Sequence, residues 1–324
     1  MRRRELIALA IGVAAFRHLA ARAQQAVPTI GFLHQGAQPT QQLMDSFRQG
    51  LGETGLTEGR DYTIENRSAE GKYDQLPTLA AELIGRRVAV IAAELLPAAL
   101  AVKAASQSIP VVFLTGSDPI GSGLVSSLSR PTANVTGIAF MFTLLGGKNL
   151  QLLREVVPKA AVIGVLVNTN NPNAKPQLAD LQAAGKALGQ ELVAFGATNE
   201  REIDDAYDKM MAHPVGALIV TADGFLISRQ DRLLSLAARH ALPTMYSLSQ
   251  YVRAGGLMSY GANLTEGFRQ TGNYVGRVLH GTKPADLPVF QSSKFELFVN
   301  LKTAKALGLT IPATILASAD ELIE

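Results

Sequence analysis

The 324-residue chain contains no cysteine and no tryptophan. The first absence excludes disulfide bonds, thiolate metal sites and cysteine nucleophiles. Charged residues are also few, at 18%, whereas hydrophobic residues reach 47%. This composition is typical of a compact α/β protein rather than a disordered or fibrous one. The length favours two domains over a single one.

Net positive charge is confined to the N-terminus. The whole chain carries a formal charge of +3, but residues 1–23 alone hold five arginines against one glutamate, so the remainder carries −1. A surface that neutralises nucleic-acid phosphates needs clustered Lys and Arg. No such cluster follows residue 23, and we therefore expect no nucleic-acid partner.

The first 23 residues have the three parts of a secretory signal. Arginines 2–4 precede the apolar run Leu6–Phe16, and Ala21-Arg22-Ala23 supplies small residues for cleavage after Ala23. The run is shorter than the roughly 20 apolar residues that span a bilayer. We predict a cleaved signal over 1–23 and a periplasmic location. The arginine pair resembles the twin-arginine export signal, and Sec export stays open.

Short apolar runs alternate with segments of helical periodicity from residue 28 onward, which predicts parallel strands joined by crossover helices. The predicted strands are Thr29–His34, Asp61–Arg67, Val88–Ala93 and Pro110–Thr115, then Val162–Asn168, Glu191–Gly196, Gly216–Thr221 and Pro243–Ser247. The predicted helices are Gln41–Glu53, Leu76–Ile84, Pro97–Ser106, Leu144–Val156, Ala174–Leu188, Glu200–Ala212, Leu226–His240 and Leu264–Leu279. From Leu287 onward a strand, a short helix and a turn close the chain.

Each strand of the second half follows its counterpart by about 130 residues, a domain-sized spacing. We predict an α/β protein of two similar doubly wound parallel-sheet lobes joined by a hinge. The predicted first lobe is 28–143 with 263–290, and the second is 144–262 with 291–324. Gly146-Gly147 and Gly255-Gly256 are candidate hinge positions or ordinary turns.

Ligands of doubly wound sheets bind at the carboxyl ends of the strands. In the first half, His34 and Gln35 end the first strand, Glu94 and Leu96 follow the third, and Thr115 ends the fourth. If the two lobes face each other at these ends, the topology brings these side chains to one cleft.

Polar residues also follow the strands in the second half and after the fourth strand. Ser117 and Asp118 either cap a helix beginning at Pro119 or form with it an anion site. Asn168 and Asn170 either contact a polar ligand or form turns. Asp223 either pairs with a ligand ammonium or caps the next helix.

Motifs for catalysis are missing. The five histidines form no H-E-x-x-H pair, no G-x-S-x-G elbow occurs, and no P-loop is present. Gly121-Ser122-Gly123 has Ser126 at the third glycine position of a dinucleotide loop, and it follows the wrong strand. We therefore expect no cofactor, no metal ion and no catalytic residue.

Several segments together resemble the ABC transporter substrate-binding proteins of the tryptophan/tyrosine-type group. They are the MRRRELIALA start, 97–106, 117–137, 166–174, 242–261 and 300–312. The resemblance implies a type I periplasmic-binding fold that closes over an amino-acid-like ligand and delivers it to an ABC permease with its ATPase. We expect a monomer that is not an enzyme.

The same resemblance implies roles for individual residues. Ser117 and Asp118 would hold the ligand carboxylate and Asp223 its ammonium. Asn168, Tyr246 and Tyr260 would line the cleft, with Tyr260 alternatively packing at the hinge.

One segment departs from the family pattern. Members often have a Gly-Thr-type turn before the helix at Pro97, whereas this chain has Glu94-Leu95-Leu96. Loss of a hydrogen-bonding hydroxyl changes what a buried polar site binds. An aromatic amino acid, a branched one and a different ligand all stay open. The alternative functions are an enzyme with a cryptic site between the lobes and a ligand-sensing protein without a transport role.

Overall fold

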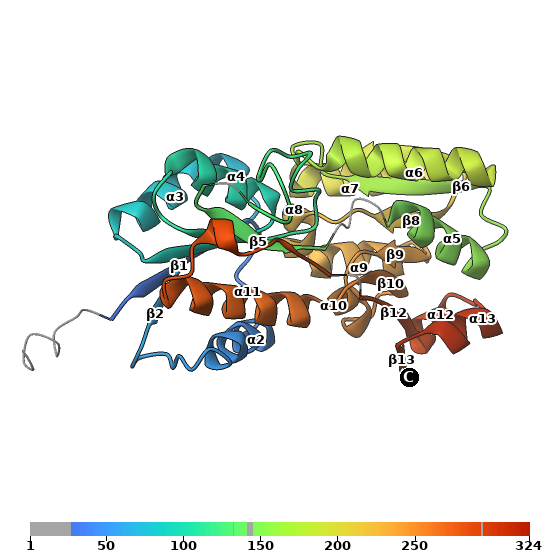
Figure 1. Ribbon diagram of the computed structural model, residues 1–324. Coiled ribbons are helices and arrows are strands. Elements are labelled where there is room, and N and C mark those ends of the chain that lie inside the picture. Colours follow the sequence, from blue (N-terminus) through green and yellow to red (C-terminus); the bar gives the residue numbers. More distant parts are fainter. Residues whose placement is uncertain (1–26, 132, 141–144, 293) are drawn as a thin grey trace, which may run out of the picture.

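The computed structural model describes residues 27–131, 133–140, 145–292 and 294–324. They form two lobes, each built on one sheet with helices on both faces (Figure 1). The predicted fold class is therefore confirmed. The predicted signal, residues 1–23, lies outside the described residues. Across these ranges no helix combines the length and apolar composition that a membrane span requires.

The first sheet is entirely parallel, in the order β11-β5-β4-β3-β1-β2. Its strands are β1 Thr29–His34, β2 Thr63–Ser68, β3 Val90–Glu94, β4 Val111–Thr115, β5 Val135–Ala139 and β11 Phe290–Gln291. The chain order reverses between β1 and β3, which are adjacent. A ligand crevice is expected at such a reversal, outside the carboxyl ends of the strands.

The second sheet repeats this topology in the order β13-β12-β10-β9-β8-β6-β7. Its strands are β6 Val162–Val167, β7 Glu191–Gly196, β8 Val215–Val220, β9 Thr244–Tyr246, β10 Met258–Ala262, β12 Phe295–Asn300 and β13 Glu321–Ile323. Only the β10–β12 pair is antiparallel. The corresponding reversal lies between β6 and β8.

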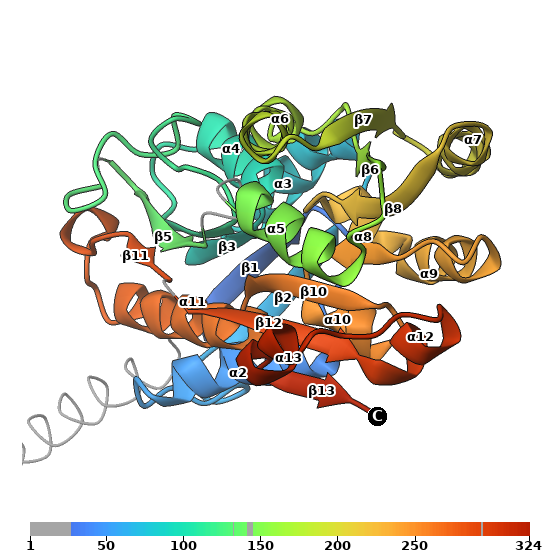
Figure 2. The same ribbon diagram turned by 90° about the vertical axis from the view of Figure 1, so that its right-hand side faces the viewer.

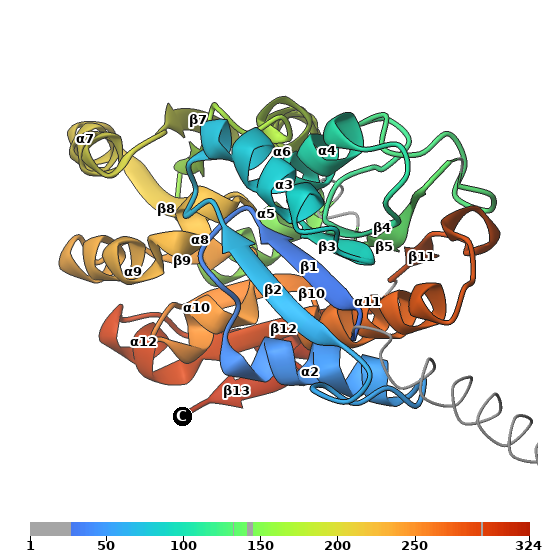
Figure 3. The same cartoon turned by 90° about the vertical axis from the view of Figure 1, so that its left-hand side faces the viewer.

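Two apolar layers cover the first sheet. Helices α3 Leu76–Gly85 and α4 Leu96–Ala105 pack on one face, and α2 Gln41–Gly52 and α11 Leu264–Leu279 pack on the other (Figure 3). Short 3-10 helices, η1 Tyr73–Gln75 and η3 Pro284–Asp286, lie in its loops. The core is thus divided into two clusters by the sheet.

The second lobe has the same layering. Helices α5 Gly146–Val156 and α6 Ala174–Leu188 cover one face, and α7 Glu200–Ala212, α8 Gly224–Ser228 and α9 Gln230–Arg239 cover the other (Figure 2). The remaining helices of this lobe are α10 Ser249–Arg253, α12 Leu301–Ala306 and α13 Ala313–Ser318. Side-chain caps at Asn199 and Asn263 begin α7 and α11.

Two predicted helices are wrong. The single helix expected over 226–240 is divided at Arg229, where the Ser228 hydroxyl bonds the Phe225 carbonyl and competes with the helical pattern. No helix begins at Pro119. Asp118 caps a turn, which ends at Gly123 in the left-handed region, φ +74°.

The chain crosses between the lobes three times: between β5 and α5, at Asn263 between β10 and α11, and between β11 and β12. One apolar cluster joins residues beside all three crossings: Phe140, Ala262, Leu264 and Phe295. Of the two alternatives offered for Gly255-Gly256, the structure shows the ordinary turn, which joins α10 to β10 within the second lobe. Gly146-Gly147 begins α5, beside the first crossing.

Helices α2 and α11 approach closely because each has a glycine at the contact. A Cβ atom added at Gly50 would lie 1.8 Å from the Arg269 carbonyl oxygen, and one at Gly272 would lie 2.0 Å from the Phe47 carbonyl oxygen. Only glycine permits this spacing. The contact fixes α11 on the first lobe immediately after the second crossing.

We expect Gly50→Ala to lower the free energy of unfolding by about 1–3 kcal/mol, because the added methyl group pushes the backbones of α2 and α11 apart. Chemical denaturation measures this change. Gly52→Ala is the matched control on the same helix, since no atom lies within 4 Å of its added Cβ. We expect that control to be neutral or stabilising by up to about 1 kcal/mol. Equal effects of the two substitutions would contradict the packing described.

Candidate functional site

Polar side chains meet where the strand order reverses in each sheet. In the first lobe, His34 at the end of β1 is the direct register partner of Glu94 at the end of β3. In the second lobe, Asn168 follows β6 and Asp223 follows β8. Both groups lie at carboxyl ends of parallel strands, as the sequence predicts.

His34 holds Glu94 in place. Its Nδ1 lies 2.9 Å from Glu94 Oε2, and its Nε2 lies 3.1 Å from Asn66 Oδ1. The ring also stacks on Phe32, with centroids 4.2 Å apart, and it is fully buried. His34 therefore orients the carboxylate of Glu94 and has no surface for a ligand, contrary to the predicted ligand contact.

Asp223 is a buried carboxylate with many donors from its own lobe. Its Oδ1 accepts the backbone N–H of Leu226 at 2.8 Å and so caps α8. Asn171 Nδ2 donates to Oδ2 at 2.7 Å, and Asn168 Nδ2 lies 3.2 Å from both oxygens. The capping role that the sequence offered for this residue is therefore present.

Tyr73 brings a further donor to Asp223 from the first lobe. Its hydroxyl donates to Asp223 Oδ2, and it accepts hydrogen bonds from Gln35 Nε2 at 2.6 Å and Asn168 Nδ2 at 3.3 Å. Gly36 of the first lobe also approaches Gly224 of the second, so that an added Cβ would lie 2.9 Å from the Gly224 oxygen. The two lobes are thus in direct contact through Tyr73.

Burial determines the protonation of this contact. Desolvation raises the pKa of Asp223 above its ordinary value, while the hydrogen bonds from Tyr73, Leu226 and Asn171 lower it in part. Burial and the neighbouring carboxylate raise the pKa of the Tyr73 phenol well beyond its ordinary value. The phenol therefore keeps its proton and acts as the donor.

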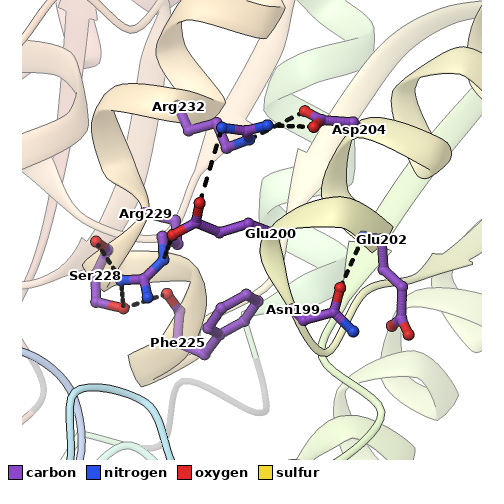
Figure 4. A network of polar contacts seen from close by, with 8 residues as sticks. All are labelled: Asn199, Glu200, Glu202, Asp204, Phe225, Ser228, Arg229 and Arg232. Atoms are coloured by element: carbon purple, nitrogen blue, oxygen red, sulfur yellow. Dashed lines mark hydrogen bonds and ion pairs between the residues drawn. The ribbon is translucent and has the colours of Figure 1, made fainter.

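A polar network fixes α8, which follows Asp223, against α7 (Figure 4). Arg229 pairs with Glu200 at 2.6 Å, and its guanidinium lies 5.5 Å from the Phe225 ring centroid. Arg232 pairs with Asp204 and, at 3.9 Å, with Glu200. These pairs hold the segment that presents Asp223 and Gly224 to the first lobe.

A pocket with a cavity volume of about 40 Å³ lies between the lobes beside Asp223. Its lining residues come from both lobes: Gln35, Glu94, Leu95, Gly116, Asn171, Asn173, Gln177, Ala222, Asp223, Gly224, Ile227, Leu248 and Leu264. An adjoining pocket shares Gln177 and Ala222 with it and includes Tyr260. A further cavity, called the mouth below, shares six of its lining residues, Glu94, Leu95, Gly224, Ile227, Leu248 and Leu264. The mouth is larger, at about 270 Å³.

Leu95 has an uncommon backbone at this pocket. Its φ is +69°, in the left-handed region that a branched side chain rarely adopts. The residue directly precedes α4, and its N–H donates to the Leu114 carbonyl at 2.7 Å. The strained backbone turns the Leu95 side chain toward the pocket, where the family resemblance leads one to expect a glycine-type turn.

The structure brings four of the predicted ligand residues to these pockets: Gln35, Glu94 and Asp223 at the first, and Tyr260 at the adjoining one. Asn168 lies behind Asp223, to which it donates. Thr115 and Ser117 are buried at the end of β4, where the Thr115 hydroxyl accepts the Ser117 N–H at 3.1 Å. Neither lines a described pocket.

Four predicted contacts lie elsewhere. Leu96 packs in the core between α3, α4 and the sheet, because the chain turns at Leu95 instead. Asp118 caps its exposed turn, and Asn170 is an exposed turn residue. Tyr246 is 1% exposed and stacks on Tyr251, with ring centroids 4.5 Å apart, so it belongs to the hydrophobic core of the second lobe.

Tyr73 was missed by the sequence reasoning. It follows β2, and the rule that site residues follow strand ends would have reached it. The apolar lining residues Ile227, Leu248 and Leu264 belong to helical or loop segments, and their sequence pattern equally predicts core packing.

The comparisons with known proteins identify binding proteins as the relatives of this chain. A family model described as ABC transporter substrate binding protein matches residues 36–323. A tyrosine-binding protein of Clostridioides difficile (strain R20291) is 27% identical over 263 residues, covering 81% of this chain and 75% of that protein.

Two solved structures allow the conformation of this chain to be compared with a ligand-bound relative and with a ligand-free one. An ABC domain in complex with L-Trp from Streptococcus pneumoniae is 27% identical, with a TM-score of 0.84 over 92% of this chain and 100% of that chain. The ligand-free, open structure of a substrate-binding protein with adhesive properties from Clostridium difficile is 26% identical. Its TM-score is 0.65 over 92% of this chain and 99% of that chain. The arrangement here is therefore more similar to the L-Trp complex.

We expect Tyr73→Phe to lower the free energy of unfolding of the arrangement in which the lobes touch by about 1.5–3 kcal/mol at neutral pH, because a hydrogen bond to a buried carboxylate is lost. This bond lowers the pKa of Asp223, so its removal raises the folded-state pKa further. The loss of stability has its full size at pH values above the folded-state pKa of Asp223 in the variant, and it shrinks as the pH falls through that pKa. Denaturation by urea at a series of pH values measures this dependence.

Tyr274→Phe is the matched control, since the Tyr274 hydroxyl donates to the Pro288 carbonyl at 2.8 Å, within the first lobe. Its loss involves no carboxylate, so we expect about 1 kcal/mol at every pH. The same pH dependence for both variants would show that Tyr73 does not act through Asp223.

Proposed function

Since the chain belongs to the ABC transporter substrate-binding protein family, we propose that it binds an amino-acid-like ligand in the pocket between its lobes. It delivers this ligand to an ABC permease and its ATPase and catalyses no reaction. The observation that carries the proposal is the pocket itself, which both lobes line at the carboxyl ends of their parallel strands.

The ligand class follows from the pocket and from the relatives. Leu95, Ile227, Leu248 and Leu264 offer apolar surface beside a few polar groups, which suits an apolar or aromatic side chain attached to a polar end. One relative is named for binding tyrosine, and another was solved with L-Trp. We therefore propose aromatic amino acids as the ligands.

The mechanism we propose is closure of the two lobes about the three crossings. A ligand docks on one lobe and favours the closed state through its extra contacts with the other. The Tyr73–Asp223 hydrogen bond and the close approach of Gly36 to Gly224 exist only when the lobes meet. The greater similarity to the L-Trp complex than to the open relative supports this motion.

We propose that the protein acts outside the cytoplasm, in the periplasm. The motif of residues 1–23 supports an exported chain, because it has the charged, apolar and small-residue parts of a cleaved signal. The lobe division predicted from the sequence, with boundaries near 143, 262 and 290, is retained for this mechanism. Each boundary lies close to one of the three crossings.

We expect L-tyrosine or L-tryptophan to stabilise the purified protein by about 2.7 kcal/mol at 100 times its dissociation constant. Thermal-shift assays, followed by calorimetry, measure this effect. L-glutamate is the control, because its second carboxylate would enter a pocket already lined by Glu94 and Asp223. Absence of any shift with both aromatic amino acids would overturn the proposed ligand class.

Small-angle scattering tests closure. We expect ligand saturation to reduce the radius of gyration of the wild type, whereas Gly36→Val stays expanded, because its side chain meets Gly224 of the other lobe. Gly85→Val is the matched control, since no atom lies within 4 Å of its added Cβ. Saturated wild-type protein without any compaction would contradict the mechanism.

A further inference from the structure

We propose that the ligand ammonium is received on the first lobe, by the carboxylate of Glu94 with the side-chain oxygen of Gln35, and not by Asp223. This inference rests on the proposed function, because it assigns one subsite of the same pocket. It reverses the role that the family resemblance implies for Asp223. The reversal follows from how the two acidic side chains of the pocket are already bonded.

The carboxylate of Asp223 is already occupied. Oδ1 accepts the Leu226 N–H, Oδ2 accepts the Asn171 amide and the Tyr73 hydroxyl, and the Asn168 amide lies within reach of both. A ligand ammonium would therefore have to displace Tyr73 and break the contact that joins the lobes.

The carboxylate of Glu94, by contrast, is only partly occupied by hydrogen bonds. In its one hydrogen bond with the described residues, Oε2 accepts from His34 Nδ1, so Oε1 has no protein donor. The side chain is 16% exposed and lines both the pocket and its mouth. His34 is itself fixed by Asn66 and Phe32. Glu94 is thus oriented in advance, with one oxygen available to a ligand.

Gln35 supplies a second acceptor in the same pocket. Its Nε2 is used by Tyr73, and its Oε1 is buried without a hydrogen-bond partner. A buried acceptor without a donor costs free energy, which an N–H group of a ligand would recover. An ammonium carries three such donors, so it can serve Glu94 and Gln35 together.

The charges of the pocket point to the same class of group. Within the described ranges, the residues lining the pocket, its mouth and the adjoining pocket include Glu94 and Asp223 but no lysine or arginine. A cation is therefore attracted, and a ligand carboxylate would have to be held by neutral donors. His34 lies behind Glu94 and is fully buried.

Isothermal titration with matched ligand pairs tests the subsite. The pairs are L-tyrosine with 3-(4-hydroxyphenyl)propanoate and L-tryptophan with 3-indolepropanoate, which differ in the ammonium. We expect the wild type to prefer at least one amino acid over its deaminated partner by about tenfold or more. Glu94→Gln should lose most of this preference, whereas Asp223→Asn should keep it even if both affinities fall.

Glu296→Gln is the matched control. The Glu296 side chain is also 16% exposed and accepts one side-chain amide, from Asn263 at 2.9 Å, but it lines a different pocket. We expect this control to keep the wild-type preference. Thermal unfolding of each variant confirms that it is folded.

The outcomes separate the two proposals. A preference that survives Glu94→Gln and disappears in Asp223→Asn overturns the subsite and leaves the proposed function intact. Equal binding of amino acid and deaminated acid by the wild type overturns the subsite as well. Failure of the wild type to bind either amino acid overturns the proposed ligand class, and the subsite with it.

Discussion

A buried carboxylate must be supplied with hydrogen bonds, and that requirement at Asp223 governs how the two lobes meet. Three groups of the second lobe already bond to it, yet Tyr73 of the first lobe completes its shell. Separation of the lobes would exchange this phenol for water, which solvates a carboxylate well. In the mechanism we propose, the hydrogen bond is therefore a moderate bias toward closure, which still allows the ligand to be released.

The two acidic side chains of the pocket, Asp223 and Glu94, have different hydrogen-bond surroundings. Asp223 lies at the start of α8, held by Asn171 and by the network around Arg229. Glu94 lies on the rigid end of β3, with one oxygen bonded and one available. We therefore assign Asp223 to the contact between the lobes and propose Glu94 for ligand recognition. Sequence alone does not separate these roles, since both residues follow buried strands.

Local signals predicted most of the fold. Helices α6, α7 and α11 have the predicted bounds because their periodicity is local and because Gly189, Asn199 and Asn263, which cap one end of each, directly adjoin them. Strands β5 and β10 were missed, since they are short and contain glycine beside polar residues. The site was harder to predict. Tyr73 and Asp223 are 150 residues apart, and no local pattern records which loops of the two lobes will touch.

The three chain crossings share one patch of apolar side chains, among them Phe140, Ala262 and Phe295, on the opposite side of β1 from the α3–α4 layer. None of these three lines the pocket beside Asp223, whereas Leu264 of the same patch does. In the mechanism we propose, substitutions of the other lining residues can therefore change which molecule is recognised without altering the joint about which the lobes turn. A scaffold with that separation is well suited to diversify: descendants of one ancestor can acquire new cargoes while each inherits the same movement.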